Sequence, residues 1–111
     1  MTGSWMEYDV VVRTNVSVPM RDGVSLAADI YLPARDGKVI DGRFPAVMER
    51  TPYDKQGQVN GGRYYARRGY AAIMQDVRGR FQSEGIWHPF AREAPDGYDS
   101  VEWAATQPWC D

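Results

Sequence analysis

The segment whose residues could most readily take part in catalysis is the loop Arg50-Thr51-Pro52-Tyr53-Asp54-Lys55, which directly follows a short apolar run. In open α/β sheets, active sites form beyond the carboxyl ends of such strands. Pro52 stiffens the loop, and a tyrosine hydroxyl stays protonated at neutral pH, so Tyr53 could donate a hydrogen bond to a developing oxyanion. The loss of one such donor typically costs about 2.7 to 4 kcal/mol of transition-state stabilisation.

No nucleophile accompanies this loop in a recognisable motif. Serine hydrolases place the attacking residue in G-x-S-x-G, whose small neighbours permit a strained turn from strand to helix, and the sequence contains no such stretch. The nearest match, Gly23-Val24-Ser25-Leu26-Ala27, lies within an expected strand. Ser83, in the stretch RFQSEG, lacks the leading glycine, and we interpret it as a turn residue.

His88 is the only imidazole that could act as a general base, and a catalytic triad would need it beside a serine and an orienting carboxylate. Its tryptophan and proline neighbours favour a position in a loop. Three acidic residues, Asp96, Asp99 and Glu102, recur at every third position of an expected helix. We interpret these acidic residues as a solvated helix face.

Residues 61–81 interleave arginines with aromatic side chains, and only Asp76 opposes their charge. Such a pattern can follow phosphates and stack bases, so a binder of single-stranded nucleic acid is one hypothesis. The favoured alternative is a core strand over 70–77 that buries its aromatic residues, with the arginines on a helix and a loop at either end. The residues concerned are Arg63, Arg67, Arg68, Arg78, Arg80, Tyr64, Tyr65, Tyr70 and Phe81.

The chain has 111 residues, a net charge of -2 and a single cysteine, Cys110. The length fits one domain, and the charge provides no global field that would recruit nucleic acid or an anionic membrane. One cysteine with one histidine cannot complete a zinc site without carboxylates or a second chain, so we expect no metal and no cofactor. The N-terminus lacks the basic and apolar regions of a signal peptide, which predicts a cytoplasmic protein.

Hydrophobic periodicity predicts the elements that position these residues. Apolar side chains alternate over 10–20 and again over 24–32, around Asp22-Gly23, which indicates a β-hairpin with a tight turn. The polar stretch 33–43 predicts a surface loop. Nearly continuous apolar runs at 44–50 and 69–77 are typical of strands buried on both faces.

Two helices complete the expected order of elements. A short one is predicted over 63–68, between the two apolar runs, and a second from Pro95 to Thr106, before the helix-stopping Gln107-Pro108. A hairpin followed by strand, helix, strand and helix predicts an α/β architecture with a sheet that becomes parallel.

Four stretches, in this order and at this spacing, resemble the start of the Xaa-Pro dipeptidyl-peptidase and cocaine esterase family. They are VPMRDGVSLAADIYLP (18–33), ERTPYDK (49–55), RRGYAAIMQDVRGRFQSEG (67–85) and DGYDSVEWAATQPWCD (96–111). The resemblance runs from about Asn15 to Asp111. It implies a serine hydrolase of the α/β-hydrolase fold that acts on ester or amide acyl bonds, with a helical cap and a C-terminal jelly-roll domain.

The same resemblance places the family's oxyanion tyrosine, in its P-Y-D-K loop, on Tyr53. The nucleophile elbow, the acid and the histidine of the family triad fall beyond Asp111, so His88 and Ser25 gain no role from it. We therefore expect residues 1–111 to be a partial hydrolase domain, truncated before the nucleophile strand and inactive alone. Trp109 and Cys110, first considered as part of a reactive tail, become packing residues.

The resemblance also implies that the strand at 44–48 pairs with the nucleophile strand. Without that strand this edge would be bare, and bare apolar edges invite association. We expect self-association or complementation by a downstream half, with an interaction module at the open edge as an alternative function. The substrate expected for the complete enzyme is a small ester or amide, and we expect neither nucleic acid nor membrane as a partner.

Overall fold

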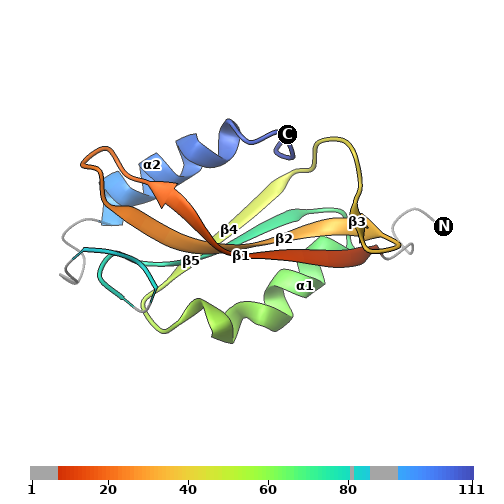
Figure 1. Ribbon diagram of the computed structural model, residues 1–111, viewed down its shortest axis with the longest axis horizontal. Helices are drawn as coiled ribbons and strands as arrows, with labels where there is room; N and C mark the ends of the chain where they lie inside the picture. The colour runs from red at the N-terminus through yellow and green to blue at the C-terminus, as the bar shows by residue number, and fades with distance from the viewer. Residues whose placement is uncertain (1–7, 81, 86–92) are drawn as a thin grey trace.

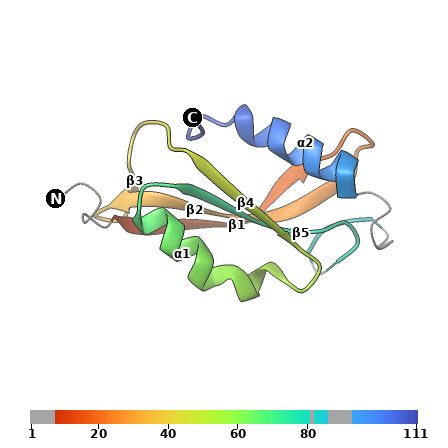
Figure 2. The ribbon, with the colours of Figure 1, turned by 180° about the vertical axis from the view of Figure 1, so that it is seen from behind.

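The computed structural model describes residues 8–80, 82–85 and 93–111. Its strands form one mixed sheet, with a helix on each face (Figure 1), and the view from behind shows the same order of helix, sheet and helix (Figure 2). The strands are β1 (Asp9–Pro19), β2 (Ser25–Arg35), β3 (Lys38–Val39), β4 (Ala46–Thr51) and β5 (Ala71–Asp76). The helices are α1 (Val59–Arg67), α2 (Glu93–Ala105) and the short 3-10 helix η2 (Lys55–Gln58).

The predicted β-hairpin is confirmed as β1 and β2, paired antiparallel with Val18 opposite Leu26. Gly23 closes the turn with a φ of 87°, a conformation that a residue without a Cβ adopts at no steric cost. The strands are not regular throughout, because a β-bulge interrupts the register between Arg13 and Val16. Bulges bend a strand and re-aim its groups, and this one presents a backbone N–H of β1 toward β2.

The predicted surface loop over 33–43 is partly wrong. Strand β2 continues to Arg35, and β3 folds back on it, with Lys38 opposite Arg35. The two residues between them, Asp36 and Gly37, have φ values of 55° and 79°. Positive φ at both central positions is the geometry of a two-residue hairpin turn. The first Asp-Gly pair forms a longer turn, in which only Gly23 has a positive φ and the Met20 N–H donates to the Val24 carbonyl.

The strands of the parallel part agree with the prediction from the apolar runs, but the expected burial of the 44–50 run on both faces is wrong, because Ala46 is exposed and residues 47–50 are only partly buried. The strand order is β1-β2-β5-β4, and β5 runs antiparallel to β2 but parallel to β4. Every residue of β5 is buried, as expected for a strand covered on both faces. The α/β architecture, in the form of a hairpin followed by strand, helix, strand and helix, is therefore confirmed.

Helix α1 begins at Val59, four residues before the predicted start. The prediction placed the start too late because Gly61 and Gly62, in the first turns, lower helix propensity. Packing explains why the helix forms there nonetheless. A Cβ on Gly62 would lie 2.5 Å from ring carbons of Tyr31, so only glycine lets α1 approach β2 this closely. Neither α1 nor α2, among the helices that the structure describes, is long and apolar enough to cross a membrane.

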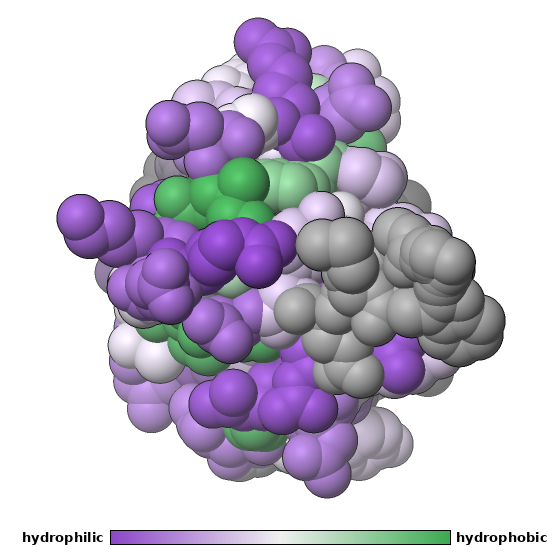
Figure 3. Space-filling view, turned by 90° about the vertical axis from the view of Figure 1, so that its right-hand side faces the viewer, coloured by the Kyte–Doolittle hydropathy of each residue, from purple (hydrophilic) through white to green (hydrophobic). Residues whose placement is uncertain are grey.

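Successive strand residues belong to two different core layers, one on each face of the sheet, because side chains alternate between the faces. Ile30 and Ile73 point toward α2, whereas Tyr31 and Met74 point toward α1. The end of the molecule near β3 carries mainly hydrophilic side chains, with small apolar areas between them (Figure 3). The larger layer contains Val18, Met20, Leu26, Ala28, Ile30, Leu32, Ala71, Ile73, Ala104, Trp109 and Cys110.

Strand β4 is the last in the strand order, and a parallel bridge joins Phe44, two residues before β4, to Cys110 in the C-terminal segment. The Phe44 N–H donates to the Trp109 carbonyl at 2.8 Å, and the Asp111 N–H donates to the Phe44 carbonyl at 2.9 Å. The carbonyl of the next residue, Pro45, accepts from Ala71 at the start of β5. Backbone groups alternate in direction along a strand, so the bridge lies on the side of β4 away from β5.

Candidate active site

Tyr53 lies in the short connection between β4 and η2, beyond the carboxyl end of β4. Parallel pairing sets Thr51 opposite Asp76, so β4 and β5 end at the same edge of the sheet. The Tyr53 side chain is 82% exposed, and its backbone N–H donates to Thr51 Oγ1 at 2.9 Å. The phenol is therefore presented to solvent from a loop whose backbone is bonded to the strand that precedes it.

The segment after β5 supports this loop from one side. The Val77 N–H donates to the Thr51 carbonyl at 3.1 Å, which extends the parallel pairing by one bond. Arg80 Nε donates to the Pro52 carbonyl at 3.1 Å. Both bonds reach the residues directly before Tyr53, so two loops from neighbouring strand ends are joined at the edge where the sequence predicted a site.

Lys55 fixes the loop from the other side. Its side chain is fully buried, and its Nζ lies 3.1 Å from Asp29 Oδ1 in the middle of β2. Its backbone N–H donates to Asp76 Oδ1 at 2.7 Å. Between Tyr53 and Lys55, Asp54 has a φ of 87° and accepts from the Gln56 N–H at 3.0 Å, which caps η2. The strained residue is thus held between fixed neighbours.

Asp76 is the buried carboxylate that both loops share. Its Oδ1 accepts from Lys55, and its Oδ2 accepts from the Gln82 N–H at 3.3 Å. Burial raises the pKa of Asp76 because the charged form loses its hydration, and the hydrogen bonds from Lys55 and Gln82 oppose that shift. Asp76 therefore stays out of solvent and holds the two loops together through the hydrogen bonds that its carboxylate accepts.

The sequence analysis did not identify Asp29, Lys55 and Asp76 as parts of the site. An available signal was the acidic residue inside each of two strands whose other residues are almost all buried. A buried carboxylate requires partners, and in both strands the partner is Lys55, which lies far away in the sequence. Local periodicity marks the carboxylates as unusual but does not say what faces them.

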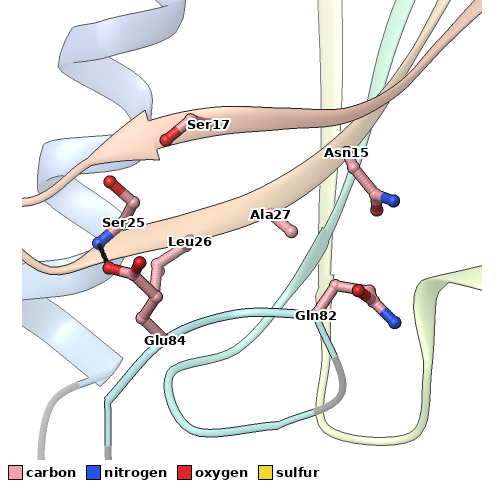
Figure 4. A pocket seen from close by; sticks show the side chains of 7 residues that line it. All are labelled: Asn15, Ser17, Ser25, Leu26, Ala27, Gln82 and Glu84. Atoms are coloured by element: carbon pink, nitrogen blue, oxygen red, sulfur yellow. Dashed lines mark hydrogen bonds between the residues drawn. The ribbon is translucent and has the colours of Figure 1, made fainter.

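The two serines considered in the sequence analysis lie where hydrogen bonds join β2 to the segment after β5. Ser83 is buried in a turn, as predicted, where its Oγ donates to the Asp76 carbonyl at 2.6 Å and accepts from the Ala27 N–H at 2.8 Å. Ser25 begins β2 and lines a shallow pocket, where its backbone N–H donates to Glu84 (Figure 4). The residues lining that pocket include no imidazole, and His88 lies outside the described residues.

The interpretation of the acidic helix flank as solvated is wrong for Asp96. Its side chain is fully buried and accepts two hydrogen bonds from Arg78, at 2.9 Å and 2.8 Å. Asp99 pairs with Arg21 at 2.7 Å, and Glu102 alone is exposed as expected. The start of α2 packs on the turn between β1 and β2, so charges that repeat along the helix meet arginines from distant segments.

The arginine and aromatic stretch divides as the favoured interpretation expects, with Arg63 and Arg67 on α1 and the core strand β5 behind them. The expected burial of the aromatic residue in the predicted strand over 70–77 is wrong, because Tyr70 is 38% exposed; Tyr64, on α1, is 51% exposed. Arg78 is buried against Asp96, and the hydrogen bonds that it donates to the Asp96 carboxylate raise the pKa of the guanidinium. It is therefore not available to a phosphate, whereas Phe81 lies outside the described residues.

No group of three or more histidine, cysteine, aspartate or glutamate side chains that could hold a metal occurs within the part of the chain that the structure describes. Cys110 is buried beside Trp109, in agreement with the packing role that the sequence predicted for both residues.

Comparisons with known proteins show the family of this chain. The X-Pro dipeptidyl-peptidase (S15 family) model matches residues 22–111. The cocaine esterase of Rhodococcus sp. (strain MB1 Bresler) is 42% identical over 106 residues, which cover 90% of this chain and 18% of the esterase. The chain thus spans about a fifth of the length of the relatives that it matches.

Solved structures agree with the sequence relatives. A CocE/NonD family hydrolase from Staphylococcus aureus superposes with a TM-score of 0.78 at 27% identity, covering 92% of this chain and 21% of that hydrolase. An alpha-amino acid ester hydrolase gives a TM-score of 0.71 at 31% identity, covering 90% of this chain and 19% of that enzyme. The chain therefore belongs to the X-Pro dipeptidyl-peptidase (S15) family, and its sheet is the N-terminal part of an α/β-hydrolase sheet.

Proposed function

We propose that this chain is the N-terminal portion of a serine acyl hydrolase of the esterase and peptidase class, and that Tyr53 supplies a hydroxyl to its oxyanion hole. The observation that carries the proposal is the exposed phenol on a fixed loop at the carboxyl end of β4. A donor stabilises a developing oxyanion best when it is already oriented. Hydrogen bonds at Thr51, Pro52 and Lys55 hold the backbone on either side of Tyr53 and so fix where the side chain begins.

The nucleophile, the acid and the catalytic histidine are assigned to a polypeptide segment that would follow Asp111. The parallel bridge between Phe44 and Cys110 supports this assignment. A strand that continued from the bridge would run parallel to β4, so its carboxyl end would emerge at the edge where Tyr53 lies. A serine in the turn after that strand would then face the same space as the phenol.

The test compares the 111-residue chain with a longer protein that contains it and a G-x-S-x-G turn. We expect the chain alone to leave p-nitrophenyl acetate and an Xaa-Pro p-nitroanilide unhydrolysed, since it has no such motif. The longer protein should turn over at least one of them and lose that activity to a serine-reactive phosphonate. Phosphonate-sensitive hydrolysis by the short chain would overturn the proposal.

The substrate class of the complete enzyme is a small ester or amide. The cocaine esterase relative and the alpha-amino acid ester hydrolase both carry ester chemistry in their names, which favours an ester. Steady-state measurements on matched ester and Xaa-Pro amide substrates decide between the two. A kcat/KM that is higher for the amide would overturn the choice of an ester but not the acyl-transfer mechanism.

The outer edge of β4 gives the chain a second expected property. Within the described ranges, β4 is the last strand of the sheet and has no strand partner on its outer side beyond the bridge at Phe44, and such edges pair with other strands. We expect the isolated chain to self-associate, or to bind a separately expressed downstream half that supplies the next strand. Size-exclusion chromatography that shows a cooperatively melting monomer would contradict self-association.

A further inference from the structure

Lys55 is a buried cation in a small domain. Lysine is almost never fully buried unless its charge is paired, and here the whole side chain lies out of solvent with its Nζ 3.1 Å from Asp29 Oδ1. Asp29 also accepts from the Asn15 N–H at 3.0 Å, the group that the β1 bulge presents. The lysine therefore reaches through the structure to a carboxylate that is itself fixed by two strands.

The two ends of Lys55 are held by different strands. The ammonium pairs with β2 through Asp29, while the backbone N–H bonds to Asp76 at the end of β5. Tyr53 lies only two residues before Lys55. Since the chain spans at most about 3.3 to 3.6 Å per residue, any shift of the Lys55 backbone must move the Tyr53 backbone or strain the connection.

We propose that Lys55 is a positioning residue for Tyr53, anchoring the oxyanion loop to β2 and β5 through its side chain and its backbone. This inference rests on the proposed role of Tyr53. The Lys55 side chain is fully buried and points to Asp29, so any effect on the reaction acts through the phenol. A displacement of about 1 Å at a reacting group can lower a rate up to about 100-fold, so the anchor has a catalytic consequence.

The pairing with Asp29 depends on charge more than on a directed hydrogen bond. Among the described residues, Lys55 Nζ has the 3.1 Å ion contact but no hydrogen bond of good geometry. An ammonium tolerates such an arrangement because it is a compact charge with rotatable donors, whereas a guanidinium needs room for a planar fork. We therefore expect Lys55→Arg not to restore the anchor.

The decisive experiment is a double-mutant cycle in the complete hydrolase. Lys55→Met should lower kcat about 10-fold or more with KM nearly unchanged, because the donor acts mainly in the transition state. In a Tyr53→Phe background the same substitution should lower kcat less than about 2-fold, since the group that it positions is gone. An undiminished loss in that background would overturn the inference.

The cycle separates this inference from the proposed function. If Tyr53→Phe alone leaves kcat unchanged, the oxyanion role of Tyr53 fails and the positioning role fails with it. If Tyr53→Phe lowers kcat while Lys55→Met does not, only the inference about Lys55 is overturned. A fall in stability with no change in kcat would likewise show a structural lysine and overturn it.

A second variant decides the matter if Lys55→Met does not fold. Asp29→Asn removes the counter-charge but keeps Lys55 and the acceptor for Asn15. We expect it to lower kcat in the same way and to speed trypsin cleavage after Lys55, relative to cleavage after the exposed Arg43. Asp41→Asn, at an exposed acid, is the matched control and should change neither. Unchanged kcat and cleavage in Asp29→Asn would overturn the inference.

Discussion

Arg78 and Asp96 form a two-bond ion pair inside the protein. Arg78 Nε and Nη2 donate to the two carboxylate oxygens at 2.9 Å and 2.8 Å, and Asp96 is fully buried. Arg78 also reaches Asp22 at 3.1 Å. The pair thereby joins the segment after β5 to the first turns of α2 and to the turn of the hairpin.

Arg78→Met should therefore destabilise the protein strongly. Removing one partner of a buried ion pair leaves the other charge desolvated and unpaired, which costs about 3 to 5 kcal/mol. Arg21→Met is the matched control, because Arg21 pairs with Asp99 at the surface, where ion pairs contribute little. Urea unfolding of both variants measures the difference, and equal midpoints would contradict the structural role of Arg78.

Tyr53→Phe should lower kcat of the complete hydrolase about 100- to 1,000-fold with little change in KM. The magnitude is that of losing one oxyanion donor, and the substitution removes only the exposed hydroxyl. Initial rates over a range of substrate concentrations separate the two constants. A higher KM at unchanged kcat would instead assign the hydroxyl to ground-state binding.

Adjacent glycines of α1 should respond to alanine with opposite signs. A Cβ at position 62 would lie 2.5 Å from the Tyr31 ring, so Gly62→Ala should cost about 1 to 3 kcal/mol through overpacking. At position 61 the nearest atoms are 3.8 Å and 4.0 Å away, so Gly61→Ala should stabilise the helix by up to about 1 kcal/mol. Thermal unfolding of the two variants checks both signs at once.

Asp76 should make stability depend on pH in an unusual direction. Its pKa in the folded state is raised above the ordinary 3.8, so the folded protein holds this proton more tightly than the unfolded chain. Stability from this group is greatest below the ordinary pKa and declines as the pH rises through the folded-state pKa. The stability of the wild type relative to Asp76→Asn should therefore fall as the pH rises above the ordinary pKa of 3.8.

Other carboxyl groups cancel in that difference, because both proteins contain them. Urea unfolding at several pH values measures it directly. A relative stability that rises with pH would mean that hydrogen bonds from Lys55 and Gln82 outweigh the burial of Asp76.

Local pattern was sufficient for most of the fold. Alternating apolar residues and the Asp22-Gly23 turn lie within one short stretch, so the hairpin can be predicted without knowledge of the rest of the chain. The same holds for the buried run that became β5. The extension of β2 to Arg35 does not follow from the polar composition of 33–43. Its local signal is the Asp36-Gly37 pair, in which both residues have the positive φ of a two-residue turn.

The sequence by itself determined the hairpin, the order of the two parallel strands and two α-helices, the family motifs and the loop that presents Tyr53, because each is encoded by neighbouring residues. Only the tertiary structure decided that Asp96 is buried against Arg78 and that Lys55 crosses to Asp29. These pairs join segments that are far apart in the sequence, and a charge in a helix or loop has the same local pattern whether it faces water or a buried partner. Burial, which depends on the whole fold, settles the difference.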